Sequence, residues 1–103
     1  MTAEVETPFV PAATALMQNF PNPFNPSTTL AFDVAQAGNV TIQVYDVSGR
    51  LVATLLDSHK EIGSHRVEWN GKNTSGSLVP SGMYFYRMKT AGFEVTKKMI
   101  LVR

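Results

Sequence analysis

Two histidines are the side chains of this sequence best suited to act as general bases near neutral pH. His59 lies in the polar run of residues 57–61, and His65 begins a run of alternating residues. An activated nucleophile needs a base and an orienting group together, and a metal site needs further ligands at a suitable spacing. Nothing in the sequence places the two histidines near each other or near such partners. We therefore predict that the chain is not an enzyme.

The segment Trp69–Gly76 superficially resembles a calcium loop. Calcium loops normally supply several carboxylates, whereas this segment offers the amides of Asn70 and Asn73 with Lys72 between them. A turn built on asparagine and glycine explains the same residues. We expect no metal and no other cofactor, and we expect Trp69 to fill the core instead of forming an exposed platform for sugars.

The elements that must position any site belong to one small domain, since the chain has 103 residues. Hydrophobic residues make up 44% of it and charged residues 17%, a balance typical of globular proteins. The net charge of +1 provides no field for nucleic acid. Cysteine is absent, which excludes disulfides and thiolate ligands. No apolar stretch is long enough for a membrane helix, so we expect no membrane insertion.

Apolar and polar residues alternate with a period of two, which is typical of strands with one buried face. The runs lie at residues 28–34, 39–46, 50–56, 64–69, 82–90 and 93–102. This pattern predicts an all-β fold, an immunoglobulin-like antiparallel β-sandwich of about seven strands, with a small open barrel as the alternative. The residues expected to face inward are Leu30, Phe32, Val40, Ile42, Val44, Val67, Trp69, Tyr84 and Tyr86.

Turn residues separate these runs. Residues 36–39 can turn the first pair of strands, and residues 46–49 (Asp-Val-Ser-Gly) predict a turn in which the aspartate accepts backbone hydrogen bonds. Ala91 and Gly92 predict a tight hairpin between the last two strands. The predicted turns therefore fall between the alternating runs.

The first part of the chain differs from the rest. Residues 1–16 have little periodicity and are expected to form a linker or a disordered lead-in, with the sandwich at 17–103. The segment 18–27 sets aromatic residues between three prolines, which favours a stiff, extended conformation. Phe20 and Phe24 are expected to plug one end of the sandwich.

Lys97 and Lys98 interrupt an otherwise apolar final run. Lysines on an edge strand block unwanted pairing between sheets. The same strand could instead be read by a partner through backbone hydrogen bonds and alternate side chains. Both interpretations stay open on the residues alone.

Five segments of the chain, taken in order, resemble the type A C-terminal sorting domains of the type IX secretion system. They are NFPNPFNPST (19–28), VYDVSGR (44–50), residues 63–71 ending in Trp-Asn-Gly, PSGMYFY (80–86) and KKMILV (97–102). The chain is also similar to the immunoglobulin-like domain of flagellar hook-capping proteins. The proline-rich segment and the Lys-Lys ending favour the sorting domain. Asn70 departs from the family pattern, in which an acidic residue is common there.

The resemblance implies a sorting signal that carries a fused N-terminal cargo across the bacterial outer membrane, through the periplasm, to the cell surface. It implies the type IX translocon, its shuttle protein and a surface sortase as partners. The residues expected to be recognised are Lys97, Lys98, Met99, Ile100, Leu101, Val102 and Arg103. Because the chain ends on an apolar strand, a homodimer formed by exchange of that strand is also expected.

Two other classes of function compete with the sorting role. A carbohydrate-binding or adhesion module would need exposed aromatic side chains, for which Tyr45, Phe85 and Phe93 are the candidates. A hook-cap-like domain would instead have a structural role in assembly.

Overall fold

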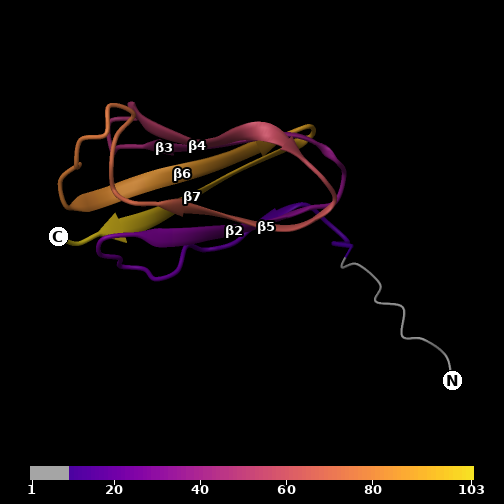
Figure 1. Cartoon of the computed structure of the whole chain (residues 1–103), viewed down its shortest axis with the longest axis horizontal. Coiled ribbons are helices and arrows are strands. Elements are labelled where there is room, and N and C mark those ends of the chain that lie inside the picture. Colours follow the sequence, from indigo (N-terminus) through magenta and orange to yellow (C-terminus); the bar gives the residue numbers. More distant parts are fainter. Residues whose placement is uncertain (1–9) are drawn as a thin grey trace, which may run out of the picture.

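Seven β-strands form the described part of the chain, residues 10–103 of a computed structural model (Figure 1). They are β1 (Ala15–Leu16), β2 (Thr28–Val34), β3 (Gly38–Tyr45), β4 (Leu51–Lys60), β5 (Gly63–Trp69), β6 (Gly82–Thr90) and β7 (Phe93–Leu101). No helix that could cross a membrane occurs in these residues. The all-β prediction is confirmed.

The strands form two antiparallel sheets that face each other (Figure 1). One sheet has the order β1-β2-β5 and the other has the order β4-β3-β6-β7. Two separate sheets make a sandwich and not a closed barrel. The strands β4 and β7 form the edges of the larger sheet, so the final strand has a strand neighbour on one side only.

The core lies between the sheets, where every second residue points inward. Of the residues expected there, all but one are buried. Val67 is the exception: it is half-buried and packs against the core from β5. Since β5 lies at the edge of the three-stranded sheet, its inner face is covered less completely.

Trp69 joins both sheets and the proline-rich segment. Its ring lies 5.6 Å from that of Phe24 and 5.3 Å from that of Tyr84, measured between centroids. Its indole N–H donates to the Lys72 carbonyl at 2.9 Å. A tryptophan whose N–H is hydrogen-bonded buries a large apolar area without leaving a polar group unpaired. Trp69 is buried, so its predicted place in the core is confirmed.

The proline-rich segment places its two phenylalanines differently. Phe24 is 1% exposed, whereas Phe20 is 79% exposed. Phe24 therefore plugs the sandwich as expected, and the same prediction for Phe20 was wrong. The backbone amide and carbonyl of Phe20 pair with Thr29, at 3.0 and 2.9 Å, and this bridge leaves its ring in solvent.

Two connections differ from the expectation. Residues 35–37 join β2 to β3, which lie in different sheets, so the turn at 36–39 crosses the sandwich and makes no hairpin. β4 continues to Lys60, so His59 lies in a strand and not in a polar loop. Beyond its alternating run, β4 stays paired with β3, with residues 57–60 opposite residues 38–41.

The hairpin between β6 and β7 turns at Ala91 and Gly92 as expected, with Gly92 at φ +72°. The strand β1 falls in the last two residues of the expected lead-in, and Leu16 is buried there beside Phe32. Residues 1–9 of that lead-in lie outside the described residues.

We predict that Trp69→Ala lowers the free energy of unfolding by about 3–5 kcal/mol, because it leaves a large cavity between the two sheets. Denaturant unfolding monitored by circular dichroism measures this loss. Phe20→Ala is the matched control, and it should change stability by less than about 0.5 kcal/mol, since the ring is in solvent. Equal losses in the two variants would contradict the packing described here.

Candidate functional site

The final strand β7 carries the residues predicted for recognition, and it is paired with β6 along its whole length. Its side chains alternate between the two faces of the sheet. Lys97 is half-buried on the inner face, and Lys98 is exposed on the outer face. The two lysines therefore point to opposite faces and cannot meet one partner surface in the same way.

The apolar residues of the strand divide in the same manner. Met99 and Leu101 are buried in the core, at 0% and 1% exposure. Ile100 and Val102 are 41% and 48% exposed. The sequence analysis grouped these four residues in one motif. In the folded domain only Ile100 and Val102 are available to a partner.

The proline-rich segment covers the outer edge of β7 near its end. The amide of Phe24 donates to the Ile100 carbonyl at 2.9 Å, and the amide of Val102 donates to the Phe24 carbonyl at 3.0 Å. The Asn22 side chain accepts from the Ile100 amide at 3.0 Å. Residues 22–24 thus add a short parallel bridge to the edge, which explains the spacing of Asn22 and Phe24 between prolines.

Buried polar contacts anchor the start of the same segment. The Tyr86 hydroxyl donates to the Met17 carbonyl and accepts from the Asn19 amide, both at 2.8 Å. The Asn19 side chain donates to the Thr28 hydroxyl at 3.0 Å. Burial raises the pKa of Tyr86 to about 12. These bonds fix the path along which the segment crosses from β2 to β7.

Arg103 is held by the loop that follows β5. Its Nε donates to the Val79 carbonyl and one terminal nitrogen donates to the Gly71 carbonyl, both at 2.6 Å. Its amide donates to the Ser81 hydroxyl at 2.9 Å. The guanidinium is therefore already engaged within the domain. Sequence reasoning had no signal for this contact, because the partners are backbone carbonyls far away in the chain.

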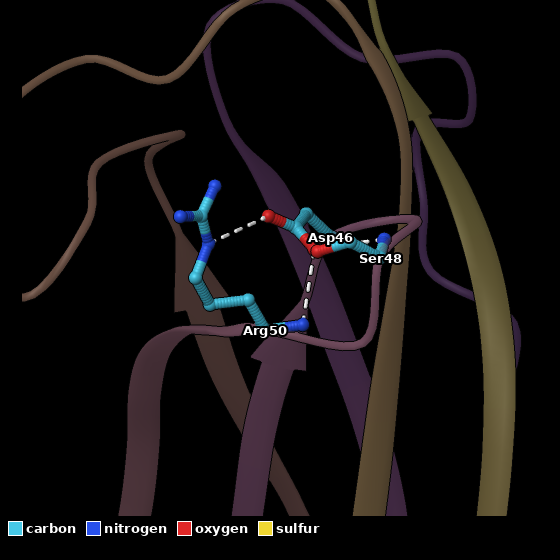
Figure 2. A network of polar contacts seen from close by, with 3 residues as sticks. All are labelled: Asp46, Ser48 and Arg50. Carbon is cyan, nitrogen blue, oxygen red and sulfur yellow. Dashed lines mark hydrogen bonds and ion pairs between the residues drawn. The ribbon is translucent and has the colours of Figure 1, made fainter.

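The β3–β4 turn forms a second polar cluster (Figure 2). One oxygen of Asp46 accepts from the Ser48 amide, the Ser48 hydroxyl and the Arg50 amide, at 2.9, 2.6 and 3.0 Å. The other oxygen lies 3.4 Å from the Arg50 Nε. The hydroxyl of Ser48 foremost, together with the Arg50 amide, lowers the pKa of Asp46 to about 2. Gly49, at φ +86°, completes the turn.

This turn borders a hollow of about 540 Å³, whose other wall is residues 79–84. Because the Asp46 carboxylate is occupied by its own turn, it is not a free base. The Arg50 side chain is 82% exposed. Of the two serines that line the hollow, Ser48 donates its hydroxyl to Asp46 at 2.6 Å and Ser81 accepts from the Arg103 amide at 2.9 Å.

The two histidines both reach Glu61, contrary to the expectation that nothing brings them together. The His59 ring contacts the Glu61 carboxylate, and the His65 ring lies 2.8 Å from the Glu61 carbonyl. His65 also stacks on Phe32 at 5.4 Å between ring centroids. Among residues 10–103, no cluster of three or more His, Cys, Asp or Glu side chains is placed to hold a metal ion.

The asparagines of the loop after β5 bond to their own backbone. The Asn70 side chain accepts from the Lys72 amide at 3.2 Å, and that of Asn73 accepts from the amides of Ser75 and Ser77 at 3.0 and 2.9 Å. This is the asparagine turn that the sequence favoured over a calcium loop.

The aromatic candidates for sugar binding are partly occupied. The Arg87 guanidinium lies 4.6 Å above the Tyr45 ring and also bonds to its hydroxyl. Phe85 and Phe93 are half-buried. Tyr45 therefore has one face already covered by a cation, which weakens the case for a line of open stacking platforms.

A family described as the FlgD Ig-like domain matches residues 22–92. Basal-body rod modification proteins FlgD from Salmonella typhimurium and Salmonella typhi are 42% identical over 48 residues, which is 47% of this chain and 21% of theirs. The chain thus spans about a fifth of the length of these relatives.

Solved structures with the same fold come from two kinds of protein. Dimeric latent PorU from Porphyromonas gingivalis has a TM-score of 0.70 and 28% identity, over 88% of this chain and 10% of that one. FlgD from P. aeruginosa has a TM-score of 0.54 and 23% identity, over 72% and 59%. PorZ from Porphyromonas gingivalis, a surface component of the type IX secretion system, has a TM-score of 0.57 and 22% identity, over 87% and 11%. The predicted immunoglobulin-like sandwich is confirmed.

We predict that Asp46→Asn flattens the acid dependence of stability. Because the folded-state pKa of about 2 lies below the ordinary 3.8, the ionised carboxylate stabilises the fold above about pH 4. That contribution is lost as the pH falls through about 2. Free energies of unfolding measured across this range should fall more steeply in the wild type than in the variant. Parallel curves would contradict the assigned bonds.

We predict that Gly71→Ala destabilises the domain by about 1–2 kcal/mol, because Gly71 has φ +73°. An added Cβ would also lie 2.7 Å from the Arg103 terminal nitrogen. In an Arg103→Ala background the second cost disappears, so a double-mutant cycle should give a non-zero coupling. Strict additivity would show that Arg103 does not hold this loop.

Proposed function

Since this chain belongs to the FlgD Ig-like domain family, we propose that it is a recognition domain of that fold which sorts a fused cargo protein through the type IX secretion system. The observation that carries the proposal is the fold that this chain shares with PorU, at 28% identity over 88% of the chain, and with PorZ, a surface component of the type IX secretion system. The family match ends at residue 92, before β7 begins. The proposal therefore gives β7 the role specific to this domain.

The geometry supports recognition of a surface without chemistry. The polar groups of the turns are engaged with one another. The exposed side of β7 offers Lys98 and Ile100, and the exposed Val102 follows the end of the strand. A cation beside two apolar side chains suits a partner groove that is apolar with an acidic rim. The translocon, its shuttle protein and a surface sortase are the partners proposed to read this side. The route would pass through the periplasm to the cell surface.

The position of the strand fits this role. Residue 10 and the chain end lie at opposite ends of the sandwich (Figure 1). A cargo fused before residue 10 would leave the end of β7 clear. The domain could then be read while the cargo stays outside the recognition site.

A hook-cap-like structural role is the second candidate. The match to the FlgD family favours it, together with 42% identity to the Salmonella proteins over 48 residues. In that case the sandwich would serve as an assembly module, and the end of β7 would need no exported partner.

We predict that the full chain fused to a periplasmic reporter exports it in a type IX host. Lys97→Ala with Lys98→Ala should reduce surface display at least about tenfold, if these cations select the partner. The control is Lys60→Ala with Lys89→Ala, which removes the same charge from other strands and should leave display unchanged. Surface labelling of intact cells measures the outcome.

Deletion of Met99 to Arg103 is a poor test by itself, because it removes two core residues. Each variant should therefore be checked for folding by its thermal melt. If the full-length fusion stays in the periplasm, the sorting role is contradicted and the hook-cap role takes its place. If both lysine pairs have the same effect, charge at β7 is not what the partner reads.

A further inference from the structure

The loop after β5 contains the one Asn-Gly pair of the sequence, Asn70 and Gly71. In such a pair the main-chain nitrogen of the glycine can attack the side-chain carbonyl carbon of the asparagine, because the glycine has no side chain to hinder it. The product of the attack is a cyclic imide. A folded protein permits this reaction where the asparagine reaches water, the attacking amide is free, and the two reacting atoms are held close together.

Asn70 meets the first two conditions. It is exposed, and it directly follows Trp69, the last residue of β5. Among the described residues, no hydrogen-bond acceptor is recorded for the Gly71 amide. The Gly71 carbonyl, in contrast, accepts from the Val79 amide at 3.0 Å and from the Arg103 guanidinium at 2.6 Å. The loop is therefore held by the carbonyl of Gly71, and the amide of Gly71 stays available.

The Asn70 side chain is also held beside the peptide that would attack it. Its oxygen accepts from the Lys72 amide at 3.2 Å, and this bond closes a ring that contains both reacting atoms, the Asn70 side-chain carbonyl carbon and the Gly71 nitrogen. The attack places negative charge on that same oxygen. A backbone N–H aimed at an oxygen on which charge develops stabilises the transition state. The turn therefore positions the carbonyl and supplies a donor for the oxyanion.

Asn73 provides the most direct comparison within the chain. Its side chain accepts from the Ser75 amide at 3.0 Å, in the same kind of turn. The next residue, Thr74, is β-branched, and its amide already donates to the Val52 carbonyl at 3.0 Å. The nitrogen that would attack Asn73 is therefore both hindered and engaged, so the turn alone does not make a reactive site.

The other four asparagines also fail at least one condition. Two of them precede prolines, which have no N–H to lose, and one precedes Phe20, whose amide donates to the Thr29 carbonyl at 3.0 Å. The fourth lies inside β3 before a β-branched valine. In that order, they are Asn22 and Asn25, Asn19, and Asn39.

We propose that Asn70 is a site of spontaneous deamidation in the folded domain. The Gly71 nitrogen gives its proton to water or hydroxide and bonds to the side-chain carbonyl carbon of Asn70. The bond from that carbon to the side-chain nitrogen breaks, and ammonia leaves. Water then opens the cyclic imide: cleavage at the side-chain carbonyl gives aspartate, and cleavage at the main-chain carbonyl gives isoaspartate. The net change consumes one water and releases one ammonia, and the inference is independent of the sorting role.

Deamidation would change the surroundings of Arg103. Either product carries a negative charge at neutral pH, in a chain whose net charge is +1. Isoaspartate also lengthens the main chain by one carbon directly before Gly71, whose carbonyl accepts from the Arg103 guanidinium. The isoaspartyl form should therefore hold Arg103 less firmly, whereas the aspartyl form keeps the original path of the backbone.

Peptide mapping by mass spectrometry, on the full chain incubated at mildly alkaline pH, tests the proposal. The Asn70 amide should be lost at least about tenfold faster than any other asparagine amide, and an isoaspartyl methyltransferase should label the product. Asn70→Gln is the matched control, because attack there would close a ring one atom larger, and its amide should be retained. If the folded chain keeps the Asn70 amide while the urea-unfolded chain loses it, the fold protects the site and the proposal is overturned.

Thr74→Gly separates the effect of the fold from that of the sequence. It places a glycine after Asn73, but the amide of residue 74 still donates to Val52. In the folded variant Asn73 should deamidate at least about tenfold more slowly than Asn70, and in urea the two rates should be similar. Equal rates in the folded variant, with an unchanged thermal melt, would overturn the role of the free Gly71 amide.

The isoaspartyl form, separated by ion exchange, gives a readout of the effect on Arg103. Asn70→Asp carries the same charge on an unaltered backbone, so it is the matched control for the lengthened chain. The isoaspartyl form should melt at a lower temperature than Asn70→Asp. Equal melting temperatures would contradict the predicted loosening of this loop.

Discussion

The contact between Trp69, Phe24 and Tyr84 is the interaction on which the rest of the structure depends. It joins a strand of each sheet to the proline-rich segment, with ring centroids 5.6 and 5.3 Å apart. A domain of about a hundred residues has only one modest core, so a single aromatic cluster holds a large part of it. With Phe24 seated there, residues 22–24 must lie along the end of β7.

That constraint gives the final strand two distinct halves. Near its end, the backbone edge is satisfied by Asn22 and Phe24, and Arg103 is bonded to the loop after β5. Among the described residues, no such cover is recorded at Glu94 and Thr96, and at Lys98 the Gln18 side chain donates to the backbone carbonyl at 2.8 Å. The side chains proposed for sorting, Lys98, Ile100 and Val102, lie along both parts of this edge.

The alternation of the sequence predicted the strands well, because sandwich strands have one buried face. The burial of Tyr84, Tyr86 and Met88 in β6 follows directly from it. The alternation could not predict that Phe24 is buried and Phe20 exposed, because both residues lie beside prolines and outside the alternating runs. It also missed the crossing of residues 35–37 between sheets, because a turn motif does not say which strands become neighbours. The sequence singled out residues 97–103 as the recognition motif, which stays a prediction. The cover over the edge of this motif could not be predicted, because it depends on contacts distant in sequence.

The division of the β7 edge is the central claim of this account, and amide hydrogen exchange of the dilute, monomeric domain tests it most directly. The amides of Ile100 and Val102 donate to Asn22 and Phe24, so they should be strongly protected. Alternate residues of an antiparallel strand direct their backbone groups to the same side, so the amide of Thr96 also points away from β6. No such partner is recorded for it among the described residues, so it should exchange many times faster. Comparable protection at all three amides would contradict the division of the strand into a half that residues 22–24 cover and a half that they leave open.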